Sequence, residues 1–481
     1  MNSGLFSGVL IAFAAGAAAV SLLWPAAGRT GAALSVFRLA LAMGVGQGIT
    51  ACMMFVFLVV HGRVDRTYIF FELLLLLILL GLYVWTRRRR VAETARPRPF
   101  GGSTSVWLDG LLALALGVAV VAAMTSIGIL VHRIAYGDWD AWAIYNLRAR
   151  SVFRGGYGWR DAFSDVVVWS HPDYPPLLPL CVVRAWLYAG GETSDGPRAI
   201  GGLFAVATIG VVCAAIAVLR GRVQACIGGV VLLGNTFMLR HAASQYADVP
   251  LMFFVSAAIA LLVLHDEFDS GEGAGALVLA GLAAALAAWT KNEGALFLAV
   301  LMLAHFAIAA RSRGLRAYGR QLAALASGAL PVLAMLIYFK SAVAPAGDLV
   351  TLVTGQSAFA KLADPARYMT IGRELLQRTP LYDGSGIGIV YLLALYGLCF
   401  GIRTRESTGV AQATLTLLLL CAGYLAVYLT TPYDLSWHIR TSMDRLFVQV
   451  WPAFVFAFFV LVRAPGEIPW AFGKVPERSA G

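Results

Sequence analysis

The chain has 481 residues, of which 59% are hydrophobic and only 13% are charged. A soluble protein carries about a quarter charged residues, so this composition excludes an ordinary soluble enzyme. The net charge of +11 reflects in part the basic loops that membrane proteins keep on the cytoplasmic side, and no nucleic-acid partner is predicted.

Long apolar segments predict an all-α polytopic membrane protein with about 13 transmembrane helices, because each segment approaches the roughly 20 apolar residues that cross a bilayer. The predicted spans are 5–24, 37–60, 68–85, 107–131, 199–219, 223–239, 249–264, 274–289, 295–310, 322–339, 387–400, 410–429 and 447–462. We expect three parts, which are N-terminal helices (1–106), a central module (107–310) with a large outer loop (133–198), and C-terminal helices (311–481) with outer loops 340–386 and 430–446.

Short basic loops predict the orientation of the chain, because such loops stay in the cytoplasm. They all fall on one side if the segment 177–190 is not a span. This segment follows a proline pair and contains Arg184, so we expect a helix lying at the membrane surface. One loop, 266–272, is acidic although it falls on the cytoplasmic side. The opposite, non-cytoplasmic side receives 133–198, 240–248, 289–294, 340–386 and 430–445.

The cysteines and the absence of nucleotide motifs argue against several kinds of chemistry. All six cysteines lie in or beside apolar segments, so we expect packing residues rather than disulfides. The sequence contains no Walker loop and no His-Glu-x-x-His run, which argues against ATP-driven chemistry and zinc hydrolysis on this chain.

The first outer loop contains two candidate catalytic acids, Asp138 and Asp140. They precede the segment 141–153, whose spacing predicts an amphipathic helix. Its predicted common side carries Trp139, Trp142, Asn146 and Phe153. Asp140 is then either the N-cap of this helix or a general base at the membrane boundary. Two acids flanked by tryptophans at headgroup depth favour the general base.

Two further acids stand in outer segments. Asp173 follows His171 in a His-Pro-Asp-Tyr-Pro-Pro turn, where the prolines restrict the backbone. This turn is a structural corner, with substrate contact by His171 or Asp173 as the alternative. Asp248 lies at the outer mouth of a predicted span. There it is either solvated at the interface or part of one site with Asp140.

Basic residues on the same side need a partner, which is either lipid headgroups or a phosphorylated substrate. Lys291 and Glu293 occupy a tight hairpin between two apolar segments, where a snorkelling lysine is the ordinary explanation. The loop 433–445 contains His438, Arg440 and Arg445, and guanidinium groups bind phosphate oxygens bidentately. Between 340 and 386 a helical spacing predicts an outer flap or surface helix over the acceptor, carried by Phe359, Leu362, Tyr368 and Ile371.

The order of these features resembles the GT-C superfamily of polytopic glycosyltransferases, in particular bacterial relatives of the protein mannosyltransferases and the lipid A aminoarabinose transferases. The resemblance covers mainly residues 138–294, with weaker support from 437–445. Its elements are Asp140 before an aromatic helix, the His171-Pro172 turn, the Asp248 hairpin and the Lys291 turn.

The resemblance implies transfer of a sugar from a polyprenyl-phosphate carrier to a glycan, lipid or protein acceptor on the periplasmic face. The family's catalytic acid is usually followed by glutamate, whereas Ala141 stands there in this chain and Asp138 lies two residues earlier. Whether Asp138 replaces the missing acid, whether a divalent cation binds and whether the chain is an inactive relative stay open. Asp140 as base and cations on the leaving phosphate require no cofactor, and a single displacement predicts an inverted product.

A secondary transporter is the rival from another class, since about a dozen spans also suits transporters. The predicted spans carry almost no charge at their centres, and the two halves show no repeat. A polysaccharide polymerase or ligase, or a non-catalytic relative, would share the outer arginines without depending on Asp140.

Overall fold

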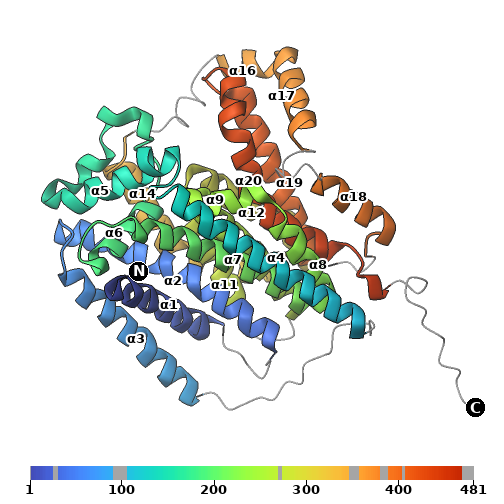
Figure 1. Ribbon diagram of the computed structural model, residues 1–481, viewed down its shortest axis with the longest axis horizontal. Helices are drawn as coiled ribbons and strands as arrows, with labels where there is room; N and C mark the ends of the chain where they lie inside the picture. The colour runs from blue at the N-terminus through green and yellow to red at the C-terminus, as the bar shows by residue number, and fades with distance from the viewer. Residues whose placement is uncertain are drawn as a thin grey trace, which may run out of the picture.

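The protein is all-helical in the computed structural model, which describes residues 2–24, 31–89, 106–268, 274–345, 357–379, 388–403 and 407–467 (Figure 1). The first half contains α1 (Ser3–Leu23), α2 (Ala32–His61), α3 (Thr67–Arg89), α4 (Val106–Arg133), α5 (Asn146–Arg154), α6 (Leu177–Ala189), α7 (Asp195–Arg220), α8 (Arg222–Leu233) and α9 (Thr236–Ser244). The second half contains α10 (Asp248–Phe268), α11 (Gly275–Ala288), α12 (Asn292–His305), α13 (Arg311–Arg313), α14 (Leu315–Ala342), α16 (Ser357–Leu362), α17 (Pro365–Arg378), α18 (Ile389–Phe400), α19 (Thr408–Thr430) and α20 (Leu435–Leu461).

Ten helices in the described ranges are long and apolar enough to cross a membrane, or 11 if a bent pair counts as one span. This supports a multi-pass membrane protein, with fewer spans than the 13 predicted. The predicted span 223–239 is the bent pair: α8 and α9 meet at 66°, and the Asn235 side chain caps α9 by accepting from the Met238 N–H. The predicted spans 274–289 and 387–400 correspond to α11 and α18, which have 14 and 12 residues. Helices of these lengths reach only about 21 and 18 Å.

The segment 177–190 forms the expected helix, α6, but protein rather than the membrane surface surrounds it. Residues Leu177 to Leu187 are all buried, and α6 packs against α1, α2, α5 and α7. Arg184 is buried as well. Its Nε donates to the carboxylate of Glu72 on α3 at 2.7 Å. The prediction of a surface helix was therefore wrong, since a buried partner from a distant helix compensates the arginine.

The predicted outer segments meet at one end of the helix bundle, called the Asp248 end below. Asp140, Asp248, Lys291 and Arg445 come from four of these segments and are linked there by ion pairs. Lys340 joins them from the end of α14. The grouping of loops predicted from the basic residues therefore agrees with the helix packing.

The loops predicted to be cytoplasmic meet at the other end of the bundle, called the Asp266 end below. Asp266 pairs with Arg313 and accepts a hydrogen bond from Ser407. Arg220 pairs with Glu467 at 2.8 Å. The acidic residue in an otherwise basic set of loops is thus compensated by Arg313 and also supports the start of α19.

The segment 340–386 contains two short helices in its described part, α16 and α17, separated at Asp364, whose side chain caps α17. Ile371 is buried, whereas Phe359 is 81% exposed. Lys361 donates to the Thr431 carbonyl, so the pair lies against the end of α19, next to α20 (Figure 1). Residues 346–356 and 380–387, which belong to the predicted flap, lie outside the described residues.

Close contact between α11 and α14 gives a prediction for stability. A Cβ atom at Gly281 would overlap the backbone carbonyl of Leu325, so even alanine must push the helices apart. We expect Gly281→Ala to destabilise the protein by about 1–3 kcal/mol, which is typical of overpacking. Gly319→Ala on α14 meets nothing within 4 Å and is expected to be neutral or slightly stabilising. Denaturation midpoints in detergent test the pair, and an equal effect of both substitutions would contradict close packing at Gly281.

Candidate functional site

Asp248 is the centre of a buried charge network at the Asp248 end. It is the first residue of α10 and is 0% exposed. Its Oδ1 accepts from Lys291 Nζ at 3.1 Å and from Gln449 Nε2 at 2.5 Å. Its Oδ2 accepts from Arg445 Nε at 3.2 Å and Nη2 at 2.8 Å. Tyr424 completes this side by donating to Gln449 Oε1, so both carboxylate oxygens are held by α20 and the α11–α12 turn.

Arg445 also holds Asp140, the acid from the first outer loop. Its Nη2 lies 2.7 Å from Asp140 Oδ2, and its guanidinium carbon lies 4.8 Å from the centre of the Tyr246 ring. The backbone after Asp140 begins as a π-helix, Ala141–Tyr145, and Asp140 makes no side-chain cap hydrogen bond. The N-cap explanation is therefore wrong, because the carboxylate points to Arg445 instead of the helix start.

The predicted helix 141–153 differs from expectation in its faces. Trp139 and Trp142 are 59% and 50% exposed and contact each other. Asn146, predicted on the same side, is buried and donates to Gln245 Oε1 at 2.9 Å. The π-helical first turn shifts the register, so the two tryptophans and Asn146 do not share one face.

Lys291 and Glu293 lie in the turn between α11 and α12, as the hairpin prediction required. Lys291 is 3% exposed, and its Nζ lies 2.7 Å from Glu293 Oε1 in addition to its contact with Asp248. Burial lowers the Lys291 pKa, but the carboxylates of Asp248 and Glu293 outweigh burial and raise it above its ordinary value. Lys291 is therefore a fixed positive charge.

A second polar group adjoins the network at Asp173. Its Oδ2 accepts from Asn292 Nδ2 at 2.8 Å, next to Lys291 in sequence. Lys340 Nζ contacts Asn292 Oδ1 at 2.9 Å and Asp173 Oδ2 at 3.4 Å. His171 has a left-handed backbone (φ 49°) and stacks on Tyr174. The turn at 171–176 thus places Asp173 beside the turn between α11 and α12. The His171 ring stacks on the Tyr174 ring.

Arg148 fixes the segment that leads into this turn. It is 2% exposed, and its Nη2 donates to the carbonyls of Ser170 and His171, both at 2.8 Å. Burial lowers the Arg148 pKa to about 10. A guanidinium group that joins two carbonyls holds the left-handed turn at His171 against α5.

Besides His171 and Asp173, three sequence-predicted site residues lie outside the network. Asp138 pairs with Arg240 at 3.0 Å, in an exposed position. His438 contacts the Thr431 hydroxyl at 2.9 Å through Nδ1, and Arg440 is exposed. Asp138 therefore lies outside the network, with Arg240 as its partner.

The charges in the network largely neutralise one another. Asp140, Asp248 and Glu293 supply three carboxylates, and Lys291 and Arg445 supply two cations. Two of the cations predicted to bind phosphate, Lys291 and Arg445, are thus already paired with the predicted acids. Within the described residues, no group of three or more His, Cys, Asp or Glu side chains is arranged to hold a metal ion.

Sequence reasoning missed several members of the site, namely Arg148, Tyr246, Asn292, Lys340, Tyr424 and Gln449. One signal was present for Gln449, which follows Arg445 by one helical turn and therefore shares its face. Lys340 directly follows the apolar run 322–339, which places a charge at the mouth of a span.

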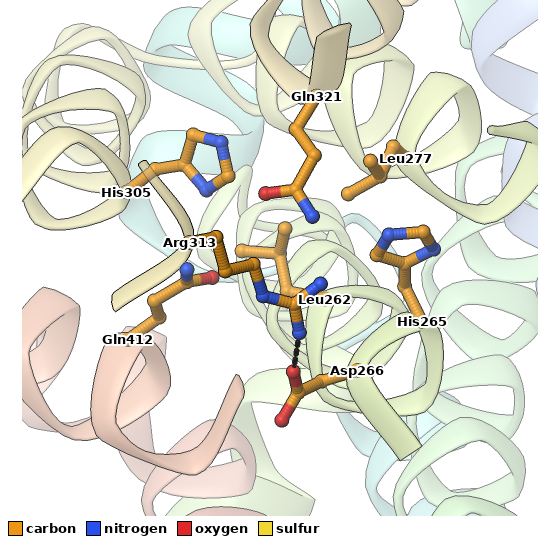
Figure 2. A pocket seen from close by; sticks show the side chains of 8 residues that line it. All are labelled: Leu262, His265, Asp266, Leu277, His305, Arg313, Gln321 and Gln412. Carbon is orange, nitrogen blue, oxygen red and sulfur yellow. Dashed lines mark hydrogen bonds and ion pairs between the residues drawn. The ribbon is translucent and has the colours of Figure 1, made fainter. Parts of the chain in front are cut away.

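A separate polar hollow lies at the Asp266 end, between α10, α11, α12, α14 and α19 (Figure 2). His265 and His305 flank it with Gln321 and Gln412, and the Asp266–Arg313 ion pair closes one side. It is at the opposite end of α10 from Asp248, so the two polar regions are separate.

None of the family models, curated proteins or solved structures with which the chain was compared matches it. The assignment of a function therefore depends on the chemistry of the site itself.

Proposed function

We propose that the protein is a membrane glycosyltransferase that moves a sugar from a polyprenyl-phosphate carrier to a glycan, lipid or protein acceptor. The observation that carries this proposal is the convergence of Asp140 and Asp248 with Lys291 and Arg445 at one end of the bundle. These residues lie far apart in the chain. Buried charges are expensive to desolvate, so a network assembled from several loops favours a chemical role.

The proposed reaction is a single displacement at the anomeric carbon. The acceptor oxygen forms a bond to this carbon while the bond from the carbon to the phosphate oxygen breaks. The acceptor proton passes to Asp140 as general base. The electron pair of the broken bond remains on the phosphate, whose charge Arg445 and Lys291 stabilise. Asp248 is a positioning residue that holds both cations, and the sugar product has the inverted configuration.

The proposed location is the inner membrane of a bacterium, with the Asp248 end facing the periplasm. Support comes from the basic loops that gather at the opposite end, where the positive-inside rule expects them. Polyprenyl-phosphate sugars presented at the periplasmic face would then reach the Asp248 end through the lipid. No cofactor is required by this chemistry, and a divalent cation at Asp140 and Asp248 is the alternative way to stabilise the phosphate.

The test is sugar transfer by the purified protein in detergent, with a panel of polyprenyl-phosphate sugars as donors and a membrane extract as acceptor. We expect one donor to yield a glycosylated product of inverted anomeric configuration. A product that retains the donor configuration would overturn the single displacement. Absence of transfer across a complete donor panel would overturn the proposal that the protein is a glycosyltransferase.

A secondary transporter is the second candidate, and the bent pair α8–α9 favours it. Discontinuous helices are a recurring feature of transporter binding sites, and the 66° bend is separated from Asp248 by the short helix α9. Sugar or sugar-lipid uptake by proteoliposomes, without any covalent product, would support this candidate over the enzyme.

A further inference from the structure

One nitrogen of Arg445 serves both candidate acids. Nη2 lies 2.7 Å from Asp140 Oδ2 and 2.8 Å from Asp248 Oδ2. The Oδ2 atom of Asp140 is thus already paired with a cation in this conformation. The proposed function requires this carboxylate to face an acceptor hydroxyl instead, so the ion pair must open first.

The two acids are held unequally. Asp248 accepts hydrogen bonds from Nε and Nη2 of Arg445, and also from Lys291 and Gln449. Among the described residues, the ion-pair partner of the Asp140 carboxylate is Arg445 alone. Asp140 is also 8% exposed, whereas Asp248 is 0% exposed. A competing anion would therefore displace Asp140 and leave Asp248 in place.

The charge balance of the network also favours an exchange in which an anion takes the place of Asp140 on Arg445. The network has three carboxylates and two cations, so an additional anion is repelled unless a carboxylate leaves. Arg445 stays in position during an exchange, because Asp248 and the ring of Tyr246 hold its guanidinium group. Its Nη2 can then pair with a phosphate oxygen in place of Asp140 Oδ2.

We propose that the phosphate of the donor displaces Asp140 from Nη2 of Arg445, so that donor binding itself releases the base. This inference rests on the proposed function. It assigns the phosphate to the Arg445 and Lys291 side of the network. It also sets the order of donor binding and proton transfer. The donor binds first, Asp140 becomes free, and only then is an acceptor hydroxyl deprotonated.

The test measures binding rather than transfer, with the full-length protein in detergent and polyprenyl monophosphate as the probe. In the intact protein the probe must break the Asp140–Arg445 pair. We therefore expect Asp140→Asn to bind the probe about tenfold more tightly, which corresponds to about 1.4 kcal/mol. Asp140→Ser, which also removes the charge, is expected to do the same. The matched control is Glu192→Gln, which removes an outer acid paired with Arg150 and Arg154 and should leave affinity unchanged.

A double-mutant cycle separates the exchange from a general electrostatic effect. In an Arg445→Gln background, we expect Asp140→Asn to alter affinity by less than about twofold. Inorganic phosphate is the second probe and should show the same fold-change as the lipid if the phosphate is the group that competes.

The outcomes distinguish this inference from the function on which it rests. If the intact protein binds the lipid probe but Asp140→Asn binds it no more tightly, the exchange is wrong and the glycosyltransferase stands. A gain that persists in the Arg445→Gln background, or one confined to the lipid probe, also overturns the exchange. If the intact protein binds neither probe, the polyprenyl-phosphate donor is wrong and the inference falls with it.

Discussion

Replacing Asp140 with asparagine is expected to reduce sugar transfer by at least about 100-fold, which is the usual range for loss of a general base. Asparagine keeps the shape of the side chain but cannot accept the acceptor proton. Arg445 would remain anchored, because Asp248 holds it through two hydrogen bonds. The measurement is the initial rate of transfer in detergent with the donor identified from the panel.

The control for this prediction is Glu192→Gln, since Glu192 is an acid at the same end whose ion pairs with Arg150 and Arg154 are largely exposed. Exposed ion pairs contribute little to stability, so this variant should keep its activity. Both variants should show the same thermal midpoint as the intact protein. Undiminished transfer by a folded Asp140→Asn protein would remove Asp140 from the chemistry and direct attention to Asp248.

Replacing Arg184 with methionine is expected to destabilise the protein by about 3–5 kcal/mol, the typical effect of leaving one member of a buried ion pair without its partner. Arg184 and Glu72 have side-chain exposures of 2% and 0%. Arg184 also donates to the Gly8 carbonyl, and Tyr188 donates to the second oxygen of Glu72. The change therefore weakens contacts between α1, α3 and α6 at once. Chemical denaturation in detergent measures it.

The double variant Arg184→Met with Glu72→Leu is the informative companion. Removing both charges eliminates the uncompensated carboxylate, and apolar replacement of a buried pair is often tolerated. We expect the double variant to recover most of the lost stability. Equal destabilisation by the single and double variants would show that packing, rather than the buried charge, determines the effect.

Much of the fold was accessible from the sequence, because apolar runs locate helices and basic loops assign their ends. The exceptions have physical causes. The 14 residues of α11 are too few to cross a bilayer alone. They are nevertheless as apolar as a span, because most of them are buried against neighbouring helices. The break between α8 and α9 had a local signal in Gly234 and Asn235, since glycine ends helices and asparagine begins them.

The candidate site was accessible in part. Asp140, Asp248, Lys291 and Arg445 were expected on one side, and the structure brings them into direct contact. Their pairing was not foreseen, because a sequence shows at which end of a helix a side chain stands but not how the helix is rotated in the bundle. Asp138 lies two residues before Asp140 and yet points to Arg240.

The two ends of α10 define a length as well as a position. Asp248 and Asp266 are about 18 residues apart, which is five full turns, so they lie on the same face of the helix roughly 27 Å from each other. Both are tied by ion pairs to other helices. That separation is close to the hydrocarbon thickness of about 30 Å, so the distance between the two ion-paired ends of α10 suits a membrane span. Inserting one residue in its middle would turn one anchor by about 100° relative to the other.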